Sequence, residues 1–140
     1  LTGDIRESTR TQLDNARLAL QQERYDDAIQ IYDAVLADQP DNSEAMAYKG
    51  RAQIGKGDME GVVTLINAAE ADPDYPDTHY FLAGALAIVG RYDSALEELD
   101  RFDALDPPPD LAAEADDLRS QIEALRASAP TSTTAPTPAG

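Results

Sequence analysis

The sequence contains no cysteine, no tryptophan and one histidine, and it is poor in basic residues. Without cysteine, the chain can form neither disulfides nor thiolate metal sites, and it has no thiol nucleophile. Its 140 residues include 27 acidic and 11 basic side chains, for a formal charge of −16. This charge repels phosphate backbones and anionic lipid headgroups, and no segment supplies a basic stripe. We therefore expect a protein or peptide partner and no nucleic acid.

Long apolar runs are also absent. The longest uninterrupted one, Tyr80 to Val89, is too short to cross a bilayer and has the length of a buried helix. We expect no direct membrane insertion by this chain. Hydrophobic residues still make up 42% of the sequence, which is enough for the core of one domain. The chain begins at Leu1 without a basic-then-apolar leader, so we expect its natural N-terminus upstream, and a signal peptide or membrane anchor there stays open.

A short motif recurs along the chain. Residues 24–29 read Arg-Tyr-Asp-Asp-Ala-Ile and residues 91–96 read Arg-Tyr-Asp-Ser-Ala-Leu, and the two copies are separated by twice a period of about 34 residues. A degenerate middle copy lies at residues 57–62. Two further sets keep this spacing, namely the small residues Ala16, Gly50 and Ala83 and the prolines Pro40, Pro73 and Pro107. Such self-similarity indicates a repeat architecture with three units.

Each unit contains two stretches with helical periodicity and no predicted strand. These helices are expected at Thr9 to Gln22, Tyr25 to Ala37, Ser43 to Ile54, Met59 to Ala71, Thr78 to Val89 and Tyr92 to Leu105. Gly57 and Gly90 suit the left-handed residue that ends a first helix. The Asp-Pro pairs at Pro73 and Pro107 are expected to stop a second helix.

These residues resemble the tetratricopeptide repeat (TPR), a 34-residue helix–turn–helix with the pattern W-x2-L-G-x2-Y, then A-x3-F, then P. The second half fits as Ala28-x3-Tyr32 with Pro40 and as Ala95-x3-Leu99 with Pro107. The middle unit reads Val62-x3-Ile66 with Pro73, one residue short, which predicts an adjustment in its second helix or in the following turn. The first half fits in the third unit, at His79, Leu82, Ala83 and Leu86, and no unit carries the leading Trp.

The resemblance implies an all-α, right-handed α-solenoid of three helix hairpins with a C-terminal capping helix. The units are expected at residues 9–42, 43–75 and 76–109, after an N-terminal flank at residues 1–8. The capping helix, residues 110–127, carries an apolar stripe of Leu111, Ala115, Leu118, Ile122 and Leu125. The alternative for this stripe is a coiled-coil seam to another chain. Residues 128–140 are rich in Ala, Pro and Thr, and we expect them to be a disordered tail.

Sites for chemistry are weakly supported. Gly50 to Gly57 matches the start of a phosphate-binding loop, but it lies in a predicted helix and lacks the Ser or Thr that holds magnesium. His79 has no second histidine to join it in a metal or catalytic cluster, and we interpret it as a half-buried structural imidazole. The acidic runs lack a calcium-loop pattern. We expect no enzyme activity, no metal and no cofactor.

The resemblance also implies a binding groove along the first helices of the units. Transferring the groove-facing positions of the family to this sequence selects eleven residues, with Glu44 and Asp77 as rim carboxylates. Those positions are Arg10, Leu13, Arg17, Leu20, Tyr48, Arg51, Ile54, Tyr80, Phe81, Gly84 and Ile88. The Asn and Lys arrangement with which chaperone-binding members hold a C-terminal carboxylate is not matched at Leu13, Arg17 and Ala47.

Arg17 and Arg51 are one repeat apart and therefore occupy equivalent places in adjacent units. Our hypothesis is that they clamp a carboxylate of the partner, because the planar guanidinium donates two parallel hydrogen bonds to such a group. The alternative is that both arginines neutralise the protein's own carboxylates. The sequence leaves these two interpretations open.

The function predicted from these residues is a protein–protein interaction module that binds a peptide or partner helix in the concave groove. One alternative is a structural element that joins identical chains through the groove or the Leu111 to Leu125 stripe, although we favour a monomer. A weaker likeness, in layout only, connects the chain to the repeat domains of extracytoplasmic cytochrome c maturation factors. Arg outnumbers Lys nine to two, from which we expect a bacterial source, with either an extracytoplasmic or a cytoplasmic location.

Overall fold

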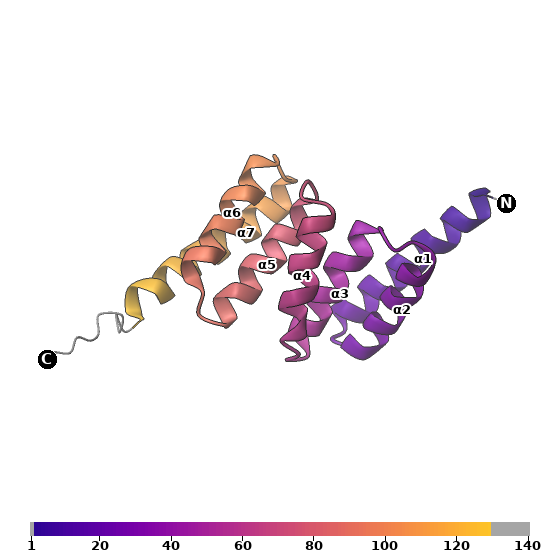
Figure 1. Cartoon of the computed structure of the whole chain (residues 1–140), viewed down its shortest axis with the longest axis horizontal. Helices are drawn as coiled ribbons and strands as arrows, with labels where there is room; N and C mark the ends of the chain where they lie inside the picture. The colour runs from indigo at the N-terminus through magenta and orange to yellow at the C-terminus, as the bar shows by residue number, and fades with distance from the viewer. Residues whose placement is uncertain (1, 130–140) are drawn as a thin grey trace, which may run out of the picture.

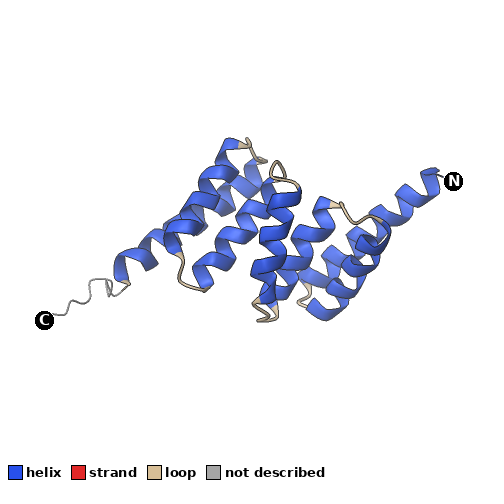
Figure 2. Ribbon diagram, in the orientation of Figure 1, coloured by secondary structure: helices blue, strands red, loops and turns tan. Residues whose placement is uncertain are grey.

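The computed structural model describes residues 2–129, with side chains from residue 8 onward. These residues form helices and connecting turns and contain no strand (Figure 2). The helices are α1 (Thr2–Gln21), α2 (Tyr25–Asp38), α3 (Ser43–Gly55), α4 (Glu60–Ala71), α5 (Pro76–Ile88), α6 (Tyr92–Ala104) and α7 (Pro109–Ser128) (Figure 1). The all-α prediction is confirmed. The first helix begins at Thr2, within the segment expected as a flank, and the expected tail lies outside the described residues from residue 130 onward.

Consecutive helices pack as the hairpins α1/α2, α3/α4 and α5/α6, and each hairpin also packs against the next (Figure 1). The odd-numbered helices contact one another in the order α1, α3, α5 and α7. Among the described residues, the even-numbered helices make no such contacts with each other. The stack is therefore curved, because its odd-numbered helices are close together and its even-numbered helices are spread apart. The odd-numbered helices form the inner, concave side.

The core consists of two clusters that meet at one side chain. Helices α1 and α2 and part of α3 bury a cluster around Tyr32, and α4 to α7 with another part of α3 bury a second cluster around Leu65, Leu99 and Phe102. Tyr48 of α3 packs against both clusters. Each even-numbered helix has three buried positions without a charged side chain at the same spacing, and α6 also buries Glu98. The three positions are Ala28, Tyr32 and Val35 in α2, Gly61, Leu65 and Ala68 in α4, and Ala95, Leu99 and Phe102 in α6.

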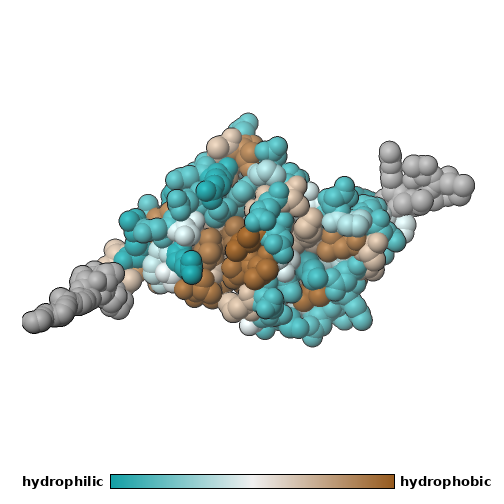
Figure 3. Space-filling view, in the orientation of Figure 1, coloured by the Kyte–Doolittle hydropathy of each residue, from teal (hydrophilic) through white to brown (hydrophobic). Residues whose placement is uncertain are grey.

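This spacing corrects the alignment of the middle unit. The buried pair is Gly61-x3-Leu65, whereas the predicted pair Val62-x3-Ile66 is displaced by one residue and leaves Ile66 40% exposed. Val63, at 51%, is also exposed. The face drawn in Figure 3 concentrates its hydrophobic surface near the middle of the molecule, among largely hydrophilic surroundings. Val62 and Ile66 could be mistaken for core positions because α4 is apolar on more than its buried face.

The missing residue of the middle unit lies in the turn before α4, not in α4 or in the turn after it. Gly61 and Pro73 are twelve residues apart, as are Ala28 and Pro40, so the second helix and the following turn have their usual length. The turn from Gly57 to Gly61 is one residue shorter than the turn from Gly90 to Ala95. The N–H of Gly61 accordingly donates to the carbonyl of Asp58, three residues back, whereas the N–H of Ala95 donates to that of Arg91, four residues back.

Two glycines allow α3 and α4 to cross closely. A Cβ atom on Gly50 would lie 2.6 Å from Cγ of Leu65, and one on Gly61 would lie 2.8 Å from the carbonyl oxygen of Gly50. Both distances are shorter than real Cβ contacts, so these positions require glycine. The equivalent residues in the first and third units are fully buried alanines. The middle hairpin therefore has the smallest residues at its crossing.

The turns inside the hairpins use a left-handed residue, as predicted for Gly57 and Gly90, whose φ angles are +87° and +80°. The first hairpin places Glu23 at the equivalent position with φ +58°. Side chains with a Cβ are strained in this conformation, whereas glycine adopts it freely. The phosphate-loop-like segment from Gly50 lies in α3 and this C-terminal turn, as expected.

The last helix packs over the third hairpin, as expected of a capping helix. It contacts α6 and α5, and it buries Ala115 and Ile122 in the second core cluster. Leu111 and Leu118 pack against the same cluster, whereas Leu125 is 47% exposed. The predicted stripe thus divides into buried residues and residues that remain accessible.

The crossing of α3 and α4 yields a stability prediction. Gly61→Ala should lower the free energy of unfolding by about 1–3 kcal/mol, because its Cβ would overlap backbone atoms that cannot move independently. Gly84→Ala in α5 is the matched control, since a Cβ there meets only Cδ2 of Leu118, at 4.0 Å. This control should raise the free energy by about 1 kcal/mol through helix propensity. Urea unfolding followed by circular dichroism measures both, and equal effects of the two substitutions would contradict the close crossing.

The strained turn of the first hairpin yields a second stability prediction. Glu23→Gly should raise the free energy of unfolding by up to about 1 kcal/mol, because glycine relieves the left-handed strain while adding some entropy to the unfolded chain. Glu23→Ala removes the same charge without relieving the strain and should not stabilise. Thermal unfolding of the two variants separates the causes. If alanine stabilised as much as glycine, loss of negative charge would be the reason instead.

Candidate functional site

The concave side contains two neighbouring cavities. The apolar cavity, about 370 Å³, lies between α3, α5 and α7, and its lining includes Ile54, Gly84, Ile88, Leu118 and Leu125. The polar cavity, about 330 Å³, lies nearer the N-terminal end, and its lining includes Arg17, Gln21, Tyr48, Leu111 and Glu114. Arg51, Tyr80 and Phe81 line both cavities. Together they form one groove that changes from polar to apolar along its length.

The structure brings nine of the eleven sequence-predicted residues to this groove. They are Arg17, Leu20, Tyr48, Arg51, Ile54, Tyr80, Phe81, Gly84 and Ile88. Leu13 does not line either cavity, because it is buried in the first core cluster and 4% exposed. Arg10 also lies outside the cavities and is held by carboxylates of the protein itself. Contrary to the predicted set, these two residues do not line the cavities.

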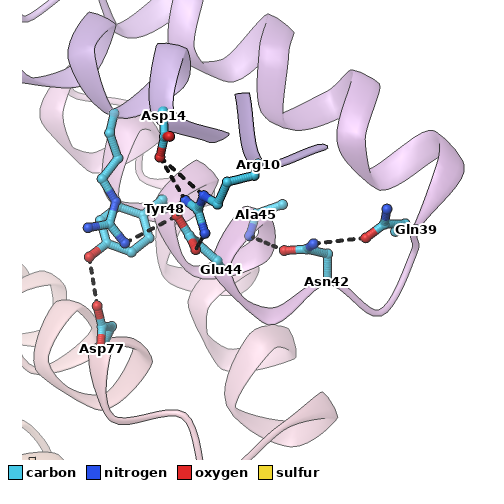
Figure 4. Close-up of polar contacts among 9 residues, drawn as sticks. Arg10, Asp14, Gln39, Asn42, Glu44, Ala45, Tyr48 and Asp77 are labelled. Carbon is cyan, nitrogen blue, oxygen red and sulfur yellow. Dashed lines mark hydrogen bonds and ion pairs between the residues drawn. The ribbon is translucent and has the colours of Figure 1, made fainter. Parts of the chain in front are cut away.

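Glu44 organises the N-terminal end of the groove (Figure 4). Its carboxylate accepts hydrogen bonds from Arg10 at 3.2 and 3.0 Å and forms an ion pair with Arg17 at 3.2 Å. Asp14 is a second acceptor for Arg10. Arg17 therefore follows the alternative in which an arginine neutralises the protein's own carboxylate. Its Nε is buried without a hydrogen-bond partner among the described residues, so the guanidinium is incompletely satisfied.

The start of α3 fixes the position of Glu44. Oδ1 of Asn42 accepts a hydrogen bond from the backbone N–H of Ala45 at 2.9 Å, which caps the helix, and Nδ2 of Asn42 donates to Gln39 at 3.0 Å (Figure 4). Such a cap satisfies an N–H group that the first turn of a helix leaves unpaired. Glu44 and Tyr48 follow on one face of α3, since residues four apart in a helix are neighbours.

Tyr48 is the central side chain of the groove wall. Its hydroxyl donates to Oδ2 of Asp77 at 2.6 Å and so ties α3 to α5 (Figure 4). The Arg17 guanidinium lies over its ring at 4.2 Å, and the Phe81 ring meets it edge-on at 4.8 Å. Burial, together with the hydrogen bond to Asp77, raises the pKa of Tyr48, so the phenol stays protonated and keeps donating. These contacts hold the Tyr48 ring between α1 and α5.

Arg51 differs from Arg17 although the two occupy equivalent positions. Its guanidinium lies 5.5 Å from the centre of the Phe81 ring, a favourable cation–π position. No carboxylate of the described side chains lies within 4.0 Å of it. Arg51 is exposed, and both cavities open onto it. The groove thus presents one cation that is not neutralised by a direct ion pair.

The last helix supplies groove residues that the predicted set omits. Leu111 and Glu114 line the polar cavity, and Leu118, Gln121, Ile122 and Leu125 line the apolar cavity. The sequence contains a sign of this role. Leu118 follows Gly84 by one repeat length and therefore occupies the position that a groove residue would have in a fourth unit. The two sequence-based interpretations of the stripe, a cap and a seam to another chain, do not include this second role.

Two further classes of site find no support in the described part of the chain. Residues 8–129 contain no group of three or more His, Asp or Glu side chains arranged to hold a metal ion. None of the seven described helices has both the length and the apolar character needed to span a bilayer.

The comparisons with known proteins agree with the helical repeat fold. A family model described as tetratricopeptide repeat matches residues 13–61 and 63–108, well over half of the chain. No curated protein gives a significant match.

Three solved structures represent the similar folds. The TPR2B domain of yeast Sti1, from a complex with pHsp70, is 22% identical, with 83% of this chain and 99% of that chain covered and a TM-score of 0.71. The type III secretion translocator chaperone SycD of Yersinia enterocolitica is 17% identical, with coverage of 86% and 95% and a TM-score of 0.74. PcrH of Pseudomonas aeruginosa, in complex with the chaperone binding region of PopD, is 21% identical, with coverage of 90% and 96% and a TM-score of 0.71.

His79 lies outside the groove and holds α5 in place. Its Nδ1 lies 2.8 Å from Oε1 of Glu98 in α6, and its Nε2 lies 2.7 Å from the carbonyl oxygen of Pro73. Both ring nitrogens face acceptors, so the protonated imidazolium satisfies both. The hydrogen bond to Glu98 raises the pKa of His79 against the opposing effect of burial. Burial opposes the charge on Glu98, but His79 and Arg101 together lower the pKa of that carboxyl. The structural role predicted for His79 is consistent with these contacts.

These contacts predict a pH dependence of stability. Because the folded-state pKa of His79 is above its unfolded value of about 6.5, its contribution is fully present below that value and is lost as the pH rises through the folded pKa. The neutral ring can donate to only one of its two acceptors. Urea midpoints measured from mildly acidic to mildly alkaline pH should therefore fall for the wild type. The fall should be absent in His79→Gln, and an equal fall in that variant would assign it to another group.

Proposed function

The chain belongs to the tetratricopeptide repeat family, and from this premise we propose that it is a protein-interaction module that binds a peptide or a partner helix in its concave groove. The observation that carries the proposal is the contrast between the groove and the rest of the protein. A chain with a formal charge of −16 gathers two arginines and three aromatic rings around two connected cavities. Rings and arginines are the side chains most enriched in protein-binding surfaces.

The similar folds support a binding role and not a catalytic one. The solved structures of the Sti1 domain and of PcrH are complexes with other proteins, pHsp70 and the chaperone binding region of PopD. Another solved structure of this fold, the first TPR of Spaghetti (RPAP3), is bound to the HSP90 peptide SRMEEVD. These structures are 16–22% identical to the present chain, which supports a common fold and not a common partner. The partner of the present chain is therefore argued from its own side chains.

The partner we propose carries an acidic group that meets Arg17 and Arg51. Arg51 offers an unpaired guanidinium, and the side chain of Arg17 remains 42% exposed beside its ion pair with Glu44. Preorganisation supports this role, because Tyr48, Asp77 and Phe81 already hold the groove wall in place. A preformed wall loses little entropy on binding. The apolar cavity would bury the hydrophobic side of the same segment.

The test is a titration of a partner captured from native cells against the Arg17→Ala/Arg51→Ala double variant. We expect the dissociation constant to rise about tenfold or more, since charge-assisted hydrogen bonds contribute about 1.5–3 kcal/mol when desolvated. The dependence of affinity on salt should weaken as well. Arg91→Ala is the matched control, because Arg91 is exposed, lies outside both cavities and also lacks a carboxylate within 4.0 Å among the described side chains.

Unchanged affinity and salt dependence in the double variant would remove the clamp from the proposal.

Light scattering across protein concentrations tests the second candidate function, self-association. This candidate is favoured by the exposed Ile88, Val89 and Leu125 near the C-terminal end of the groove, which are 63%, 44% and 47% exposed. A dimer that persists on dilution would support it over the binding module.

A further inference from the structure

One line of equivalent positions runs along the groove and changes character from end to end. Arg17 on α1, Arg51 on α3, Gly84 on α5 and Leu118 on α7 follow one another at intervals of one repeat length. All four line the groove. The side chain at this position is thus a cation in the first two units, is missing in the third, and is aliphatic on the last helix. Of these four positions, Gly84 alone has no side chain and so leaves space in the groove.

The empty place at Gly84 is not required by packing. Cβ atoms on Gly50, Gly55 and Gly61 would lie 2.5–2.8 Å from neighbouring atoms, so packing explains those three glycines. A Cβ on Gly84 would meet only Leu118, at 4.0 Å. Glycine inside a helix is destabilising because it loses more backbone freedom on folding than any other residue. Among the described residues, no close packing contact explains the glycine at position 84, which is consistent with a role in binding.

The surroundings of Gly84 form a notch with apolar walls. Tyr80 and Ile88 lie one turn before and one turn after it on α5, and Ile54 and Leu118 line the same cavity from α3 and α7. Ile88 is 63% exposed although it belongs to this wall. A bulky side chain entering the notch would cover Ile88 and fill the space over Gly84. Burial of this kind contributes most of the affinity of anchor residues in grooves.

Arg51 borders the same notch. It lines the apolar cavity together with Gly84, and its guanidinium lies 5.5 Å from the centre of the Phe81 ring. Eight of the described basic side chains are ion-paired with the protein's own carboxylates. Arg51 is not, although the chain has more than twice as many acidic as basic residues. An unpaired cation next to an apolar notch is complementary to a carboxylate next to a bulky apolar side chain.

We propose that the groove recognises a segment of another protein that places one bulky apolar side chain in the Gly84 notch and a carboxylate on Arg51. This inference rests on the proposed function and specifies the partner's chemistry. Arg51 and Gly84 come from neighbouring helices, whose axes are usually about 8–10 Å apart. That distance corresponds to about three residues of extended chain or about two turns of helix. A second copy of this chain is a poor occupant, because each copy brings a formal charge of −16.

The experiment uses a displayed library of random peptides selected on the wild-type protein. The selected peptides should share a bulky aliphatic or aromatic residue and an Asp or Glu at one of these two spacings. Gly84→Leu fills the notch and should weaken a selected peptide about tenfold or more in fluorescence anisotropy, whereas Gly84→Ala should weaken it less. Arg51→Glu should weaken it similarly and should select Lys or Arg at the acidic position. Arg91→Glu, the matched control, should leave affinity within about twofold.

The outcomes separate this inference from the proposed function. Peptides that are weakened by Arg17→Ala but not by Gly84→Leu or Arg51→Glu would overturn the inference and leave a binding groove. A library without any groove-dependent binder would overturn both. Concentration-dependent dimerisation abolished by Gly84→Leu would assign the notch to a second copy and overturn the inference. Thermal unfolding should show that Gly84→Leu is at least as stable as the wild type, which separates a filled notch from a misfolded variant.

Discussion

The groove depends on one asymmetry of packing. The odd-numbered helices contact each other along the stack, and in the described chain the even-numbered helices do not. Small residues at the crossings within each hairpin bring the two helices together, and the glycine pair Gly50 and Gly61 is the tightest case. Because no hairpin buries its apolar face alone, each must contact the next, and these contacts set the curvature. The concave surface is thus a result of how the core is packed.

Electrostatics then decides which parts of that surface remain available. In a chain with 27 acidic and 11 basic side chains, a basic group readily finds a carboxylate. Glu44 pairs with Arg10 and Arg17, and Asp77 accepts from Tyr48, so the rim carboxylates neutralise or fix much of the N-terminal end of the groove. Arg51 has no carboxylate within 4.0 Å among the described side chains, and its guanidinium lies against the Phe81 ring instead. Two arginines in equivalent positions therefore have different surroundings.

The sequence predicted the helices well because both period and turn residues point to the same units. The period failed at α4, where Val62 and Ile66 fit an apolar pattern as well as Gly61 and Leu65 do, and only burial distinguishes them. The groove was predicted in outline because equivalent positions recur once in every repeat. The pairing of Arg17 with Glu44 could not be predicted, since the partner lies in the next unit and depends on side-chain geometry. The contribution of Leu118 was missed because the groove positions were transferred only to the first helices of the three units.

Tyr48 has a consequence for both the core and the groove. Among the hydrophobic residues of the described chain, it alone packs against both core clusters and so links one to the other. Its hydroxyl donates to Asp77 of α5, and the Arg17 guanidinium of α1 lies over its ring. One side chain thus couples the interior of the molecule to the wall of the groove, so a substitution at Tyr48 alters stability and binding together.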